Sequence, residues 1–159
     1  MATPTSGILE RRLLSRPIAD PVYRATMNLQ VAAAQFEADF AEVLAPEGLS
    51  SSALNVLRIL KGQPEGHPRG EISRRLIYRT ADVTRIIDRL TRRGLVERAR
   101  SPRDRRLSLT RLTPKGHKLV AKLNEPIEAL VARYRRKLTA DQYQQLNHLL
   151  EKLYADEAD

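Results

Sequence analysis

Apolar side chains recur at helical spacing over most of the chain and at strand spacing in one short stretch. Val83, Ile86, Ile87 and Leu90 occupy positions i, i+3, i+4 and i+7, which predicts an amphipathic helix with one buried stripe. The apolar period shortens to two residues just behind this helix and returns to helical spacing further on. The pattern predicts a mainly α fold with a small β element.

The N-terminal part of the chain is expected to contain one long helix. Residues 1–19 are rich in Ser, Thr, Pro and Arg and weakly periodic, so we expect a flexible arm or a short docking segment. Asp20 can cap a helix and Pro21 suits its first position. This helix runs to about Leu44 and is apolar on two sides, so it needs two partners: its own domain and a second subunit.

The middle of the chain has the pattern of a helix-turn-helix. A helix capped by serine precedes a short helix at about 71–76, and a three-residue turn leads to a third helix capped by Thr80 and ended by Gly94. Such a pair is the helix-turn-helix arrangement, and the outer face of its second helix is basic here. The pair alone is a weak indication, because many globular proteins contain one.

A β-hairpin directly behind this second helix makes the indication specific. Residues 95–99 form one expected strand and residues 107–110 the other, in which leucines alternate with hydroxyl side chains. The turn between them contains Arg103, Arg105 and Arg106. A strand, a basic turn and a strand behind a recognition helix are expected to form a wing.

The C-terminal part is predicted to be helical. Thr113 and Pro114 begin one helix that extends to about Leu138, and Pro126 should kink or split it, since proline removes a backbone hydrogen bond. Thr139 starts a capping box for a last helix with a broad leucine stripe. These helices lack an obvious partner besides the first long helix, so we expect them to pair with a second subunit and give a two-fold dimer.

Positive charge is confined to the predicted winged helix. The chain carries 28 Lys+Arg and 19 Asp+Glu, a formal net charge of +9. Residues 61–118 hold 17 basic and 6 acidic residues, a charge of +11, whereas the rest of the chain sums to −2. A basic patch restricted to one module is typical of a surface that contacts phosphate, although a solvated Arg-rich surface is the alternative.

Composition excludes several other classes of protein. The chain has no Cys, which removes disulfides, thiolate metal sites and a catalytic cysteine. No run approaches 18 apolar residues and no secretory signal is apparent, so we expect a cytoplasmic protein without a membrane span. The three histidines lack metal-ligand spacing, and neither a phosphate-binding Gly-rich loop nor a nucleophile elbow is present. We therefore expect neither an enzyme nor a cofactor.

Several motifs are similar to those of the MarR family of bacterial transcriptional regulators. They are Val83 to Leu90 followed by Arg93-Gly94-Leu95-Val96, then Asp104-Arg105-Arg106, and finally Leu112-Thr113-Pro114-Lys115-Gly116. The resemblance covers about residues 20–155. It implies an obligate homodimer with one winged helix-turn-helix per subunit, which represses transcription from a pseudo-palindromic operator. It further implies release from double-stranded DNA by a small aromatic or phenolic effector.

The expected organisation divides the chain into four parts. They are a flexible N-terminal arm (1–19), a dimerisation helix (20–47), a winged helix-turn-helix DNA-binding domain (48–116) and C-terminal dimerisation helices (117–159).

Three groups of residues are expected to contact DNA. Base contacts are assigned to the N-terminal end of the recognition helix: Arg79, Thr80, Ala81, Thr84 and Arg85. The wing residues are Arg103, Asp104, Arg105 and Arg106; the resemblance implies that Arg106 enters the minor groove, unless the turn is simply solvated. Phosphate contacts are expected from Ser73, Arg74, Arg98 and Arg100. Arg85 could read guanine, or pair with Asp82 or Asp88 and contact phosphate only.

An effector pocket is expected between the first long helix, the helix that follows it and the helix after the wing. Arg24, Asn28 and Gln35 could anchor a carboxylate or phenol there, or serve as exposed or dimer-contacting polar residues. Two other functions stay open at this stage. One is an architectural DNA-binding protein with little sequence preference, and the other a small-molecule binder that has lost DNA recognition.

Overall fold

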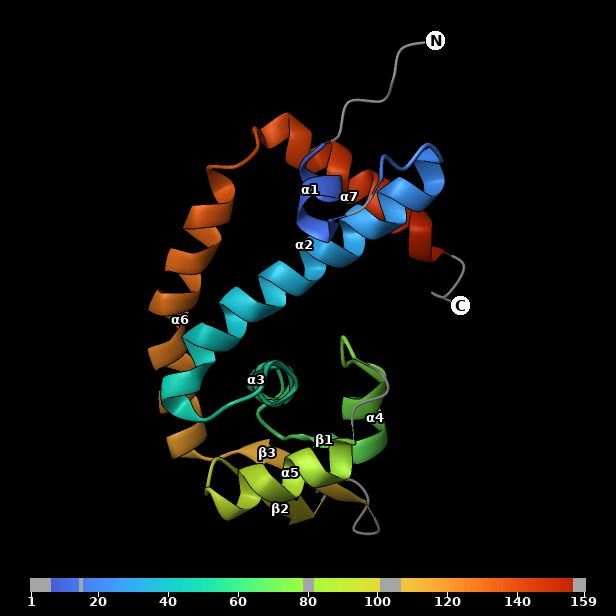
Figure 1. Cartoon of the computed structure of the whole chain (residues 1–159). Coiled ribbons are helices and arrows are strands. Elements are labelled where there is room, and N and C mark those ends of the chain that lie inside the picture. Colours follow the sequence, from blue (N-terminus) through green and yellow to red (C-terminus); the bar gives the residue numbers. More distant parts are fainter. Residues whose placement is uncertain (1–6, 15, 79–81, 101–106, 156–159) are drawn as a thin grey trace.

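The computed structural model describes residues 7–14, 16–78, 82–100 and 107–155, and Figure 1 shows their arrangement. Helices dominate, and they are accompanied by one small sheet. The elements are α1 (Ile8–Leu13), α2 (Pro21–Leu44), η1 (Ala45–Glu47), α3 (Ser51–Lys61), β1 (His67–Pro68), α4 (Arg69–Arg74), α5 (Val83–Arg92), β2 (Val96–Arg100), β3 (Ser108–Leu112), α6 (Pro114–Arg135) and α7 (Ala140–Tyr154).

A winged helix-turn-helix occupies one end of the molecule. Its helices α3, α4 and α5 gather around an antiparallel sheet of strand order β1-β3-β2, while α2 and α6 extend away from it (Figure 1). Helices α1 and α7 lie towards the far end of α2. The mainly α fold with a small β wing is thus confirmed.

The core centres on α3. Leu54, Val56, Leu57 and Leu60 are at most 1% exposed, because α3 packs against α2, α5, α6 and the sheet. Its N-cap is a serine, Ser50, whose hydroxyl accepts the backbone N–H of Ala53 at 3.2 Å, as the sequence predicts. Packing against α3 therefore fixes the positions of α5 and the sheet, which carry basic residues of the winged helix.

The recognition helix begins later than predicted. Asp82 rather than Thr80 is its N-cap, and the Asp82 carboxylate accepts the backbone N–H of Arg85 at 3.1 Å. A carboxylate both accepts this bond and interacts favourably with the positive end of the helix dipole, so it is the stronger cap. At the other end Gly94 has φ of +67°, as expected of a glycine that ends a helix.

The start of α4, the continuity of α6 and one strand also differ from the sequence prediction. The first helix of the helix-turn-helix, α4, spans Arg69–Arg74 and begins two residues earlier than expected. Helix α6 is assigned without interruption through Pro126, so proline does not split it. Strand β1 was not predicted; its two residues pair with Thr110 and Leu109 of β3, and so short a strand has no periodicity to detect.

The N-terminal segment contains a short helix that the sequence analysis did not predict. Leu9 of α1 is buried, and Glu10 is buried with its carboxylate 3.2 Å from Arg24 of α2. Glu10 also accepts the backbone N–H of Gly7 at 2.9 Å. The pKa of its carboxyl is held below the ordinary value, first by a hydrogen bond with its own backbone amide and then by the Arg24 charge and the Gly7 bond. Contact with α2 rather than local propensity therefore stabilises α1.

Glycine is required where α6 approaches the sheet. A Cβ atom on Gly116 would lie 2.2 Å from the carbonyl oxygen of Leu95 and 2.9 Å from Leu112 Cδ2. We expect Gly116→Ala to lower the free energy of unfolding by about 1–3 kcal/mol, the usual cost of overpacking. Urea denaturation measures this cost, with Gly70→Ala as the control because a Cβ there meets nothing within 4 Å. Equal stability of Gly116→Ala and the wild type would contradict the close approach of α6 to the sheet at Gly116.

A buried carboxylate connects α2 to α6. Asp39 accepts hydrogen bonds from Gln35 at 2.8 Å and from the Tyr134 hydroxyl at 3.0 Å, and Arg133 lies 3.3 Å away. The hydrogen bonds from Gln35 and Tyr134 lower the pKa of Asp39 in the folded protein, with the Arg133 charge acting in the same direction. The ionised form therefore stabilises the fold.

This stabilisation should disappear in acid. Because the folded-state pKa of Asp39 is lowered, its contribution is complete above the unfolded pKa and decreases as the pH falls through the folded pKa. We expect the stability difference between the wild type and Asp39→Asn to be largest near pH 6 and to shrink towards about pH 3. Denaturant titrations across this pH range test the prediction. A stability difference that does not depend on pH would contradict the stabilising role of ionised Asp39.

Candidate DNA interface

The first turn of the recognition helix presents an exposed polar surface. Thr84 and Arg85 are exposed, whereas Val83, Ile87 and Leu90 on the other side of α5 are buried in the core. The Arg85 guanidinium has no hydrogen-bond or ion-pair partner among the described residues. Asp88, one alternative partner, instead lies 3.0 Å from Arg98. Arg85 is thus available to an external acceptor.

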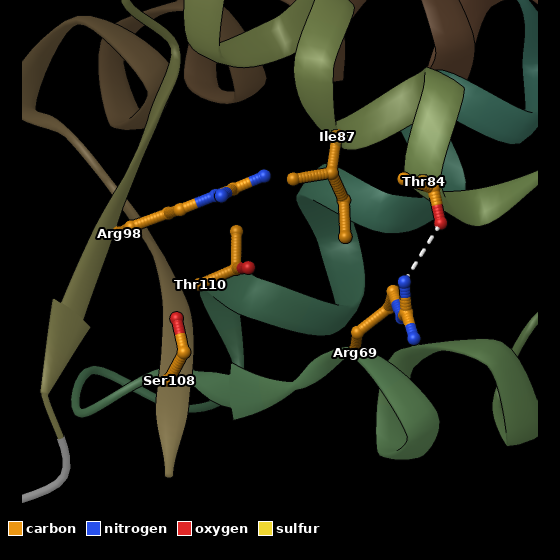
Figure 2. Close-up of a pocket in the computed structure, with 6 residues that line it drawn as sticks. All are labelled: Arg69, Thr84, Ile87, Arg98, Ser108 and Thr110. Atoms are coloured by element: carbon orange, nitrogen blue, oxygen red, sulfur yellow. Dashed lines mark hydrogen bonds between the residues drawn. The ribbon is translucent and has the colours of Figure 1, made fainter. Parts of the chain in front are cut away.

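A basic hollow lies between the recognition helix and the sheet (Figure 2). It has a volume of about 290 Å³ and is lined by Arg69, Thr84, Ile87, Arg98, Ser108 and Thr110. Arg69, the first residue of α4, donates to the Thr84 hydroxyl at 3.1 Å, while Arg98 reaches in from β2. Two guanidinium groups beside several hydroxyl groups form a suitable seat for a phosphate.

The hollow adds Arg69 to the residues identified from the sequence. Arg69 was missed because its helix was expected to begin at Glu71, which left Arg69 in a loop. The signal that could have found it is Pro68, which is the N-cap of α4, so that the basic residue directly after it begins the helix.

The residues expected to contact phosphate lie on two elements of this end of the molecule. Ser73 is half-buried in α4, and Arg74 is exposed there with Glu71 at 2.6 Å. Arg98 and Arg100 are both exposed on β2. The structure therefore places all four around the winged helix, although Arg74 and Arg98 each have an acidic neighbour. The remaining expected contacts, namely Arg79, Thr80, Ala81, Arg103, Asp104, Arg105 and Arg106, lie outside the described residues.

Not every arginine of this region faces outward. Arg93 donates to the backbone carbonyl oxygens of Glu47 at 2.7 Å and Gly48 at 3.0 Å. It therefore ties the end of the recognition helix to the segment before α3. Charge counting alone cannot separate such a structural arginine from one that contacts DNA.

A second, more apolar cavity lies where α2, α3 and α6 meet. It has a volume of about 340 Å³, and its position agrees with the pocket expected from the sequence. The lining residues are Ala33, Phe36, Glu37, Phe40, Ser51, Leu54, Asn55, Arg58, Ile77, Tyr78, Ile127 and Val131. An apolar cavity with a few polar groups is the usual form of a small-molecule site.

None of the three polar residues expected in this pocket lines it. Arg24 contacts Glu10, and Gln35 lies between Arg12 and Asp39, which are its hydrogen-bond partners. Asn28 is exposed on α2. The residues that α2 contributes to the cavity lining are instead Ala33, Phe36, Glu37 and Phe40.

The described residues contain no group of three or more His, Cys, Asp or Glu side chains that could hold a metal ion. None of the described helices combines the length and the apolar character needed to cross a bilayer.

The fold and the basic face define a winged-helix DNA-binding protein, and comparison with known proteins gives its family. The MarR family model matches residues 47–107. The homoprotocatechuate degradative operon repressor of Escherichia coli is 30% identical over 116 residues, which cover 73% of this chain and 78% of that protein. The chain belongs to the MarR family of transcriptional regulators.

Solved structures support the same assignment. The transcriptional repressor CouR bound to a 23-mer DNA duplex aligns with a TM-score of 0.74 and 28% identity, covering 87% of this chain and 99% of that one. CouR from Rhodococcus jostii RHA1 bound to p-coumaroyl-CoA shares the fold at 23% identity and a TM-score of 0.71, with 87% and 95% covered. Alignments with two other curated regulators are shorter, and the chain spans only 50% and 53% of their length.

Proposed function

We propose that this protein is a homodimeric, sequence-specific repressor that binds a pseudo-palindromic operator and releases it when a small molecule binds. The observation that carries the proposal is the first turn of α5, where Thr84 lines the basic hollow and the guanidinium of the exposed Arg85 has no partner in the described part of the chain. Arg85 can reach a guanine edge, while Arg69 and Arg98 hold the neighbouring phosphates. The recognition helix thus reads the sequence, while α4 and β2 position the protein on the DNA backbone.

The basic turn of the wing completes the proposed interface. Arg106 is assigned to the minor groove, and Asp104 to a neighbouring arginine that it holds in place. Arg103 and Arg105 are assigned to phosphates, together with Ser73, Arg74 and Arg100. An A·T-rich minor groove is narrow and has a strong negative potential, which attracts a guanidinium group. The preferred operator should therefore carry A·T pairs where the wings reach.

Exposed apolar side chains support the homodimer. Helix α7 has no buried residue, and its leucine stripe is open, with Leu146, Leu149 and Leu153 at 39%, 59% and 70% exposure. A large apolar patch on an isolated subunit marks an interaction surface. A two-fold pairing through this end of the molecule would present two recognition helices, which must be about 34–36 Å apart to enter successive major grooves.

The cavity between α2, α3 and α6 is the proposed effector site. It lies between the helices assigned to the dimer and those of the winged helix, so its contents can alter how the two parts are held. Phe36 and Phe40, whose ring centroids are 5.7 Å apart, suit an aromatic ligand. An effector acts by binding more tightly to the state in which the recognition helices do not match the operator. A regulator of this kind needs no catalytic residue, and it would act in the cytoplasm, where its target DNA lies.

Selection of binding sites from random duplex DNA tests the proposal. A sequence-specific dimer should enrich an inverted repeat whose half-sites are about 10 base pairs apart, centre to centre. An architectural DNA-binding protein would bind with steep salt dependence but enrich no sequence. Failure to enrich an inverted repeat would contradict the proposed function.

A further inference from the structure

The segment that leads into the recognition helix forms one wall of the effector cavity. Ile77 and Tyr78 line the cavity and directly precede the residues before α5. The backbone N–H of Ile77 donates to Asn55 Oδ1 at 3.0 Å, and the Tyr78 hydroxyl donates to Glu37 Oε2 at 3.1 Å. The side chains of Asn55 and Glu37 therefore hold Ile77 and Tyr78 in the cavity wall.

Glu37 connects three elements through its two carboxylate oxygens. It lies on α2 and is half-buried; Oε1 accepts the hydroxyl of Ser51 on α3 at 2.5 Å, and Oε2 accepts that of Tyr78. Burial raises the pKa of Tyr78, and the bond to Glu37 raises it further, so the phenol remains a donor at neutral pH. Tyr78 is 47% exposed, so it can leave this bond without disturbing the core.

The opposite part of the cavity carries a cation. Ser51, Asn55 and Arg58 are spaced i, i+4 and i+7 on α3, so they share one face and span about 10 Å along the helix axis. The Arg58 guanidinium is exposed and has no hydrogen-bond or ion-pair partner among the described residues. The apolar surface of Phe36 and Phe40 also lines the cavity. The cavity thus combines an acceptor, an aromatic wall and an exposed cation.

We infer that Glu37 exchanges the Tyr78 hydroxyl for a hydrogen-bond donor of the effector, and that this exchange releases Ile77 and Tyr78, which precede the recognition helix in the chain, from the cavity wall. The inference rests on the function proposed above. The effector is accordingly an aromatic acid with a hydroxyl or amino group, which Glu37 accepts, and a carboxylate, which Arg58 binds. Ligand and Tyr78 compete for one oxygen atom, so effector and DNA each weaken the binding of the other.

Hydrogen exchange on the free protein tests the Glu37–Tyr78 contact without DNA or ligand. Tyr78→Phe keeps the ring and removes the donor, so amides of residues 76–78 and 83–86 should exchange at least about threefold faster than in the wild type. Tyr23→Phe is the matched control, because Tyr23 is exposed on α2 away from the cavity lining. Unchanged exchange in Tyr78→Phe would overturn the inference.

The ligand chemistry is tested with 4-hydroxycinnamate and cinnamate, which differ by one hydroxyl group. With the wild type, 4-hydroxycinnamate should weaken operator binding at least about tenfold more than cinnamate, the value of one hydrogen bond to a charged group. Tyr78→Phe should bind the operator more weakly without ligand and lose most of this response. An equal response to both compounds, or to neither, would overturn the ligand class.

The design separates two kinds of failure. If the wild type does not distinguish operator from scrambled DNA, the proposed function fails, and hydrogen exchange still reports on the contact. If the wild type binds the operator and responds to 4-hydroxycinnamate, but Tyr78→Phe responds equally, the function stands and the exchange of donors at Glu37 is wrong.

Discussion

Leu149→Glu should dissociate the dimer and weaken operator binding by more than about 100-fold. Leu149 lies in the open leucine stripe of α7 and is 59% exposed in the single chain, so a glutamate there costs little while the subunit is alone. In a two-fold dimer the same change buries two charges without partners, a cost of several kcal/mol. A monomer retains one recognition helix and therefore loses the gain from simultaneous binding of two half-sites.

Sedimentation and operator titration measure this effect, and circular dichroism verifies that the helices persist. Gln144→Glu is the control, because Gln144 is exposed on the opposite face of α7 and the substitution adds the same charge. A dimeric Leu149→Glu protein with normal operator affinity would show that α7 does not form the interface.

Arg106→Ala should weaken operator binding by more than about tenfold while leaving the fold intact, a loss of at least about 1.4 kcal/mol. Arg106 is the wing residue assigned to the minor groove, where a guanidinium group gains from the narrow, negative groove of A·T-rich DNA. The loss should be smaller on an operator in which G·C pairs replace the A·T pairs under the wing.

Binding isotherms at fixed salt, together with thermal denaturation, measure the two parts of this prediction. Arg111→Ala is the matched control, because it removes the same charge from the hairpin at a residue that pairs with Glu97 at 2.7 Å. Unchanged operator affinity of Arg106→Ala would remove the wing from the binding mechanism.

Local sequence signals were sufficient for the elements that carry the DNA interface. The buried stripe of α5, the glycine at its end and the Thr113 cap of α6 each depend on neighbours within a few residues. Such signals predicted the winged helix and the exposed position of Thr84 and Arg85. They predicted the start of α5 too early, because Thr80 and Asp82 are both residue types that cap helices and the local sequence does not decide between them.

Contacts between distant residues could not be predicted in the same way. Helix α1 depends on the burial of Glu10 against Arg24, and β1 exists because β3 pairs with it. The cavity unites Glu37 with Tyr78, which lie 41 residues apart in the sequence. Spacing along α2 shows which residues share a face, but only tertiary packing decides that Glu37, rather than Arg24 or Gln35, borders the cavity.

The affinity for DNA directly upstream of the protein's own gene, compared with scrambled DNA of equal length at physiological salt, tests the central claim most directly. A sequence-specific repressor should prefer the upstream DNA by about a thousandfold or more, the range of specific binders. Equal affinity for that DNA and for scrambled DNA would contradict the account and favour an architectural DNA-binding protein.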